Sequence, residues 1–242
     1  MPPTKPTPCG FSPHNESTIF NNVKDFDIIV RFSKQKLHAH RIVASPFFDQ
    51  VFNSKLPGPW KVAQKDTHDL GDEDDVDAVW AMFRHMYNID YCHDPTSTET
   101  RSLEFHIAVF TTADKYDCPG LREKAVDRFG QMADTELKAG KLDRFIALIS
   151  KICGSDSPQM ADHALRDKVA ELCLTHFNVL ISSDLFARTM VQGYIFDERA
   201  AHKLLIYAIG RHVHPHLERT RGTLPDAART FKIAAEKLVS SS

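Results

Sequence analysis

The segment Phe26–Arg41 decides the fold of the N-terminal half of this chain, because it holds two short alternating runs separated by a polar turn. Apolar residues alternate along Phe26–Phe32 (FDIIVRF), and the alternation resumes in Lys36–Arg41 (KLHAHR) after the polar residues Ser33–Gln35. A period of two is typical of a half-buried strand. The pattern therefore predicts a β-hairpin of two short strands, with a helix beginning at His40.

Two further blocks accompany this hairpin, namely Met86–Tyr91 (MYNIDY) and Ala113–Leu121 (ADKYDCPGL). Together with Asp27 before an apolar strand and Leu37–Arg41 (LHAHR) after the turn, they follow the order and approximate spacing of the motifs of BTB/POZ domains. The chain thus resembles a BTB/POZ domain over residues 24–133. The resemblance implies an α/β (α+β) fold with a small sheet and surrounding helices.

Composition shifts divide the chain into three expected parts. Residues 1–22 contain five prolines and few apolar residues, which predicts a disordered Pro-rich tail. The BTB/POZ domain is expected over 23–133, and an all-helical C-terminal extension over 134–242. This order resembles BTB proteins of the fungal type, in which an all-helical extension follows the BTB domain.

Helical periodicity accounts for most of the chain after residue 72. The acidic run Asp72–Asp75 precedes apolar residues at helical spacing, and carboxylates favour the positive end of a helix dipole. We interpret this run as a solvated helix cap in preference to a metal site or a partner epitope. Further helices are predicted at Phe105–Tyr116, Leu121–Met132, Phe145–Ile152, Leu165–Cys173, Ser183–Met190 and, beyond Asp197, in two more segments.

Charge and composition exclude several classes of function. The 242 residues carry 30 basic and 32 acidic side chains, a formal net charge of -2, which gives no general attraction to nucleic acid or to an anionic membrane. The chain lacks an apolar run long enough to cross a bilayer, and its five cysteines are scattered without a CxxC pair. We therefore expect an intracellular protein, in the nucleus or the cytoplasm, with reduced thiols.

No motif in the sequence points to catalysis. A Gly-rich phosphate loop, G-x-S-x-G and HExxH are all absent, so we expect no enzyme, no cofactor and no metal site. His38 and His40 could offer two metal ligands, and the cluster of His212, His214 and His216 could offer more. We favour structural or interface roles for these imidazoles.

The BTB/POZ resemblance implies a protein interface as the functional site. In BTB dimers an Asp at the first strand and a basic residue after the hairpin share a charged pocket near the dimer surface, and Asp27 and Arg41 occupy the matching positions. His40 lies beside them in the sequence. The alternative is an ion pair between Asp27 and Arg41 that holds the fold and binds nothing.

Two departures from the family pattern bear on its partners. The stretch between His40 and the Ser45–Phe48 block is shorter than in the family by about three residues, close to one helical turn, which weakens the expectation of a homodimer. Many BTB adaptors present an apolar-x-Glu element to a cullin. Leu56 supplies the apolar residue here, but the Glu is absent and two prolines lie in this loop.

These observations favour a non-enzymatic protein-protein interaction module. The first hypothesis is a substrate adaptor that docks a cullin-RING ubiquitin ligase through the BTB unit and recruits a target through the extension. The second is a self-associating scaffold or transcription-linked BTB protein outside the ligase system. An enzyme that uses the histidine cluster is the third.

Overall fold

The computed structural model describes residues 19–44, 66–92, 102–154, 157 and 160–191. The chain divides into two compact units, Met1–Arg122 and Glu123–Ser242. The described residues of the first unit form three strands and several helical segments, whereas the described elements of the second are all helices. The chain is thus a mixed protein of small sheet and many helices, as the sequence predicts at this coarse level.

The sheet of the first unit has the strand order β2-β1-β3. Strands β1 (Ile28–Phe32) and β2 (Gln35–Ala39) are antiparallel, with Val30 opposite Leu37, which confirms the predicted hairpin. The short strand β3 (Thr67–Asp69) runs parallel to β1. Alternate residues of a strand share a face, and the side chains on one face of the hairpin are fully buried. They are Ile28, Val30, Phe32, Leu37 and Ala39.

The hairpin turn has an unusual composition for its backbone geometry. Ser33 and Lys34 both have positive φ, 43° and 63°, as the two central residues of a type I′ turn require. Such turns match the twist of the flanking strands but favour Asn and Gly at these positions. The Ser33 hydroxyl also donates to the backbone carbonyl of Asp74 at 3.5 Å, which connects the turn to the start of the next helix.

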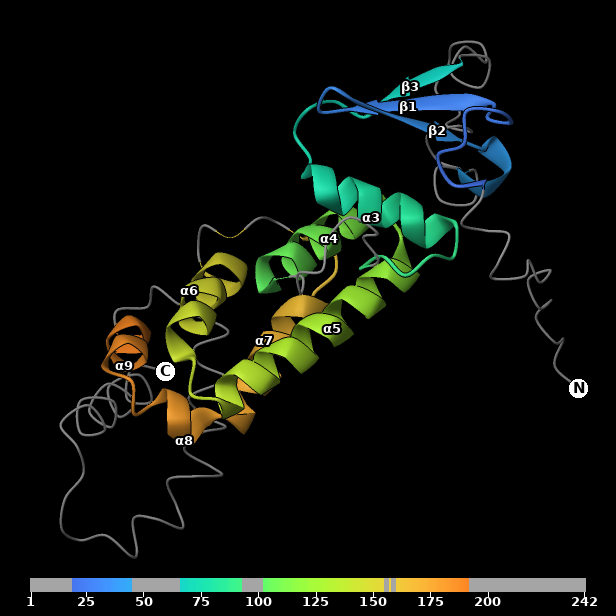
Figure 1. Cartoon of the computed structure of the whole chain (residues 1–242). Coiled ribbons are helices and arrows are strands. Elements are labelled where there is room, and N and C mark those ends of the chain that lie inside the picture. Colours follow the sequence, from blue (N-terminus) through green and yellow to red (C-terminus); the bar gives the residue numbers. More distant parts are fainter. Residues whose placement is uncertain (1–18, 45–65, 93–101, 155–156, 158–159, 192–242) are drawn as a thin grey trace, which may run out of the picture. The chain divides into compact units, whose positions relative to one another are not determined.

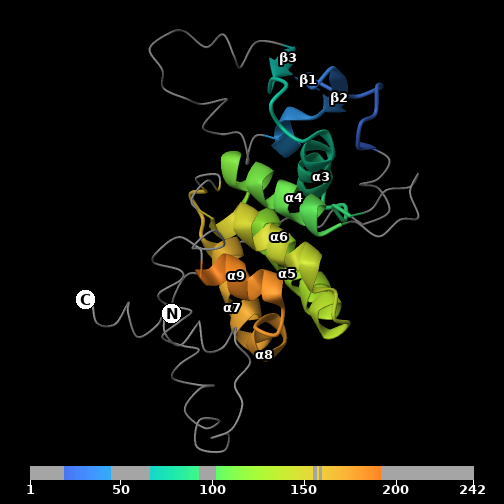
Figure 2. The ribbon, with the colours of Figure 1, turned by 90° about the vertical axis from the view of Figure 1, so that its left-hand side faces the viewer.

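Helix α3 (Val76–Met86) lies between the sheet and helix α4 (Leu103–Lys115) in both views (Figures 1 and 2). Both of its faces are therefore needed for packing, and its buried residues include Val79, Met82 and Phe83. Asp75 is the N-cap of α3, and its side chain accepts the backbone N–H of Ala78 at 2.9 Å. The predicted helix cap in the acidic run is confirmed at this residue.

Helices α3 and α4 end in the same way, with a tyrosine at the C-cap and a left-handed residue after it. Tyr87 caps α3 and Asn88 follows with φ 58°, while Tyr116 caps α4 and Asp117 follows with φ 49°. Backbone bonds from Ile89 to Arg84 and from Cys118 to Ala113 complete two Schellman motifs. These motifs give backbone hydrogen bonds to carbonyls in the last turn of each helix, which have no partner within the helix itself.

Helix α5 (Pro119–Lys138) begins at the proline predicted to mark a new helix, because proline is favoured in a first turn. It runs past Met132, the end that the sequence pattern indicates. The predicted boundary between 133 and 134 lies inside α5, and the predicted domain bounds stay predictions.

In the second unit, helix α6 (Leu142–Cys153) packs against α7 (Ala164–Thr175) and α9 (Asp184–Val191), and α7 contacts α8 (Phe177–Leu180). Arg166 joins the start of α7 to the end of α6, since its Nε donates to the Ile152 carbonyl at 3.1 Å. The predicted pairing of α6 with α7 is confirmed. The pattern missed the single turn α8, and the helices predicted after Asp197 lie outside the described residues.

We predict that Lys34→Gly stabilises the first unit. Relief of the left-handed backbone is worth about 1–2 kcal/mol, and the added chain entropy of glycine offsets about 0.5–1 kcal/mol of it. Lys36→Gly, within β2, provides the control and is expected to destabilise. Urea unfolding followed by circular dichroism measures both, and equal loss from the two variants would contradict the assigned turn.

Candidate functional site

The first helical turn after the hairpin is held by a tyrosine from α3. The backbone N–H of His40 donates to the Tyr87 hydroxyl at 2.8 Å, and the His40 Nδ1 lies 2.8 Å from the same oxygen. Because the hydroxyl accepts the backbone N–H, its own proton is available to Nδ1, which places the ring proton of neutral His40 on Nε2. Burial raises the pKa of Tyr87 to about 12, so this hydroxyl stays protonated at neutral pH.

Asp27 and Arg41 are in contact through two hydrogen bonds, each of which involves a main-chain group of one residue. The Asp27 Oδ1 accepts the backbone N–H of Arg41 at 2.7 Å, and the Arg41 Nε donates to the Asp27 carbonyl at 3.3 Å. Arg41 is the first of the helical residues 41–44, whose leading N–H groups have no acceptor within the helix. Asp27 is exposed, whereas the resemblance implies a partly buried pocket residue.

Two exposed apolar side chains belong to the segments that these contacts join. Ile42 follows Arg41 and is 84% exposed, and Val23 precedes Asp27 and is 64% exposed. The Asn21 side chain accepts the His38 N–H at 2.9 Å, which attaches residues 21–27 to the outer edge of β2. We name the surface made by Asp27, Arg41 and Ile42 the hairpin-helix surface.

Phe20, near the start of the described residues, packs against the tyrosine that holds His40. Phe20 packs edge-on against Tyr87 and Trp80, with ring centroids 5.3 and 6.0 Å apart. Residues 19–22, which the composition assigns to the Pro-rich tail, are thus in contact with α3. Trp80 also meets Phe32 of β1 at 5.7 Å, so a continuous aromatic contact links sheet, helix and entering chain.

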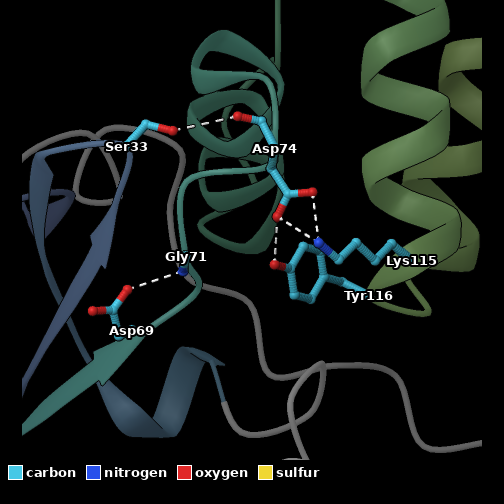
Figure 3. Close-up of polar contacts among 6 residues, drawn as sticks. All are labelled: Ser33, Asp69, Gly71, Asp74, Lys115 and Tyr116. Carbon is cyan, nitrogen blue, oxygen red and sulfur yellow. Dashed lines mark hydrogen bonds and ion pairs between the residues drawn. The ribbon is translucent and has the colours of Figure 1, made fainter.

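A second polar cluster joins the acidic run to the end of α4, and sequence reasoning missed it (Figure 3). The Asp74 carboxylate accepts Lys115 Nζ at 2.8 and 3.0 Å and the Tyr116 hydroxyl at 2.6 Å. Burial, followed by the hydrogen bond to Asp74, raises the pKa of Tyr116. Asp74 is therefore not a solvated cap but a tie between the start of α3 and the end of α4. Lys115 and Tyr116 both belong to the third motif block, Ala113–Leu121, and that block is the sequence feature that could have indicated this contact.

The other predicted interface and metal-ligand residues either lie outside the described residues or form no metal site within them. Leu56 and the cullin-type loop lie outside the described residues, as do Cys9 and the cluster His212, His214 and His216. His38 packs its ring on Phe26 at 4.6 Å, and within the described ranges no three metal-ligating side chains gather into a site. In that part of the chain no helix is long and apolar enough to span a bilayer.

The cysteines that the structure describes are mostly interior. Cys118, Cys153 and Cys173 are buried, and burial raises the pKa of the Cys118 thiol to about 12. A thiol with so high a pKa is a poor nucleophile at neutral pH. These residues fill the core as small apolar side chains.

In the second unit, the Asp134 carboxylate has two side-chain partners. Its carboxylate accepts Lys138 Nζ at 2.6 Å and lies 2.8 Å from His176 Nε2, which ties α5 to the end of α7. The hydrogen bonds from Lys138 and then His176 hold the pKa of Asp134 below its usual range.

Comparison with known proteins adds no assignment to this geometry. No family model matches the chain, and no curated protein matches it.

We predict that Asp134 makes the second unit sensitive to acid. A carboxyl whose folded pKa is lowered contributes stability above its unfolded pKa, and this contribution is lost as the pH falls through the folded pKa. Asp134→Asn should therefore lower the urea midpoint at about pH 7 and approach the wild-type value at about pH 3. Asp127→Asn, an exposed site on the same helix, is the control. A constant difference between Asp134→Asn and wild type at all pH values would contradict the linkage.

Proposed function

We propose that this chain is a non-enzymatic protein-interaction module of the BTB/POZ type, and that it self-associates through the hairpin-helix surface. The observation that carries the proposal is Ile42, which is 84% exposed beside the contact between Asp27 and Arg41. An exposed large aliphatic side chain on a fixed first helical turn is suited to burial against another protein.

Contacts between the motif blocks support the family assignment. Tyr87 of the second block holds His40 of the first, and the third block forms the junction between α4 and α5. The resemblance places the meeting point of two later BTB helices at this third block. The hairpin and the helical residues after it also follow the order that the resemblance implies.

In a self-association through this surface, the apolar side chain would contribute affinity and the charged side chains would contribute specificity. Burial of an isoleucine side chain is worth about 1.5–3 kcal/mol, which suits the centre of an interface. Asp27 and Arg41 carry opposite charges and lie in contact, so a second copy that is related by two-fold symmetry can place each opposite its complement. Such pairing sets specificity more than affinity.

We predict that Ile42→Lys weakens self-association by at least about tenfold, the ratio expected when one well-packed aliphatic contact is lost. Sedimentation equilibrium of the full chain over a range of concentrations measures the dimer dissociation constant.

Leu185→Lys provides the matched control, because Leu185 is 47% exposed on α9 of the second unit. It should leave the dissociation constant unchanged. A wild-type chain that stays monomeric at all concentrations tested, or equal weakening by both variants, would overturn the proposed surface.

The substrate-adaptor function is a proposal that rests on the family resemblance and on the loop around Leu56. It predicts that the purified full chain binds the N-terminal domain of a BTB-binding cullin with micromolar or tighter affinity, about 8 kcal/mol or more. Calorimetric titration measures this affinity, and Leu56→Asp should abolish the heat while the far-ultraviolet spectrum stays unchanged. Absence of heat from folded wild-type protein would favour the scaffold or transcription-linked function.

A further inference from the structure

Among the described residues, no strand pairs with β3 on the side away from β1. Just outside the two ends of β3, backbone bonds hold its inner side to β1, from Ile29 N–H to the Asp66 carbonyl at 2.8 Å and from Leu70 N–H to the Arg31 carbonyl at 2.8 Å. In a parallel ladder, alternate residues direct both backbone groups to the same side. Thr67 and Asp69 therefore direct their N–H and C=O groups outward, and β3 is the last strand of the described sheet.

This edge is held rigid at its C-terminal end. The Asp69 Oδ1 accepts the Gly71 N–H at 2.9 Å (Figure 3). The Gly71 carbonyl in turn accepts the Ser33 N–H at 3.1 Å. Gly71 has φ +84°, a backbone geometry that other residues adopt only with strain. Asp74 then connects the chain to Lys115 and Tyr116. A fixed edge loses little entropy when a partner strand pairs with it.

The surroundings of the edge are strongly acidic. Seven of the twelve residues from Asp66 to Asp77 are Asp or Glu, and none is Lys or Arg. Asp69, Asp74 and Asp75 have structural contacts, as described above. The other four carboxylates are exposed, namely Asp66, Asp72, Glu73 and Asp77. The exposed carboxylates of Asp66 and Asp69 flank Thr67 and His68, so a basic segment would find favourable charge along β3 itself.

The alternation of β3 specifies the pattern of such a segment. His68 lies opposite Val30 in the register and shares the face of the buried hairpin residues, whereas Thr67 and Asp69 share the outer face with Ile29 and Arg31. A strand added beside β3 would place alternate residues opposite Asp69 and beside His68. Lys or Arg on the outer face and an apolar residue on the inner face match these neighbours.

We propose that the outer edge of β3 binds an extended segment of another protein in which Lys or Arg alternates with apolar residues, and that this segment adds a fourth strand to the sheet. Backbone bonds to Thr67 and Asp69 supply affinity, and the exposed carboxylates supply selection for positive charge. This surface is separate from the hairpin-helix surface, so the inference does not depend on self-association.

The test uses a fluorescent, end-blocked peptide of sequence Thr-Lys-Val-Lys-Val-Lys-Thr, titrated with the full chain in fluorescence anisotropy. A peptide with Glu in place of each Lys is the charge control. Binding of the basic peptide is expected to weaken as sodium chloride is raised, because the attraction between exposed charges is screened. The acidic peptide is expected not to bind.

Two variants separate backbone pairing from simple charge attraction. Thr67→Pro removes an outward N–H while the bonds to β1 are kept, and proline is tolerated on edge strands. It should weaken binding by about tenfold, the loss expected for one hydrogen bond and its pairing geometry. Lys36→Pro makes the same change at the opposite edge of the sheet, on β2, and should bind as wild type does.

Each remaining outcome contradicts the proposal. If the wild-type chain does not bind the basic peptide, or binds both peptides equally, the edge has no such function. If Thr67→Pro binds as tightly as Lys36→Pro, the peptide is held by the acidic side chains alone. If Thr67→Pro instead changes the sedimentation of the chain without added peptide, the occupant of the edge is a second copy.

Discussion

The Tyr87 hydroxyl is the contact on which the candidate interface depends. It meets both the backbone N–H and the ring of His40 at the point where the hairpin becomes a helix. Without an acceptor there, a helix that starts directly after a strand would leave its first N–H groups unsatisfied in a half-buried position. Asp27 supplies the next acceptor, and together the two side chains fix the direction in which Arg41 and Ile42 project.

In the first unit, the tyrosines that end helices α3 and α4 both hold the start of another element. Tyr87 and Tyr116 are both C-caps, and both hydroxyl groups reach back to a chain segment that begins another element, His40 in one case and Asp74 in the other. A tyrosine can do this because its ring packs as an apolar group while its hydroxyl keeps a hydrogen-bond partner. Burial raises the pKa of each hydroxyl, so both contacts persist throughout the neutral pH range.

The first unit thus carries two surfaces of different chemistry. The hairpin-helix surface combines an exposed aliphatic side chain with two contacting residues of opposite charge, which is the composition expected where two proteins bury a common area. The edge of β3 combines backbone groups that pair with no other described strand with a one-sided charge, which suits an extended segment. Both lie on backbone that hydrogen bonds hold in place, so neither needs to be ordered by its partner.

The sequence by itself determined the local elements: the hairpin, the cap at Asp75, the helix that begins at Pro119 and the pairing of α6 with α7. These follow from periodicity and from capping chemistry, which act between residues close in the chain. Only the tertiary structure decided that Thr67–Asp69 would be a strand, because three residues carry too little pattern and the pairing with β1 comes from far away in sequence. For the same reason it alone assigned Asp74 to Lys115 and Tyr116 and brought Tyr87 to His40. Hydrogen bonds across more than forty positions leave no periodic trace in the chain.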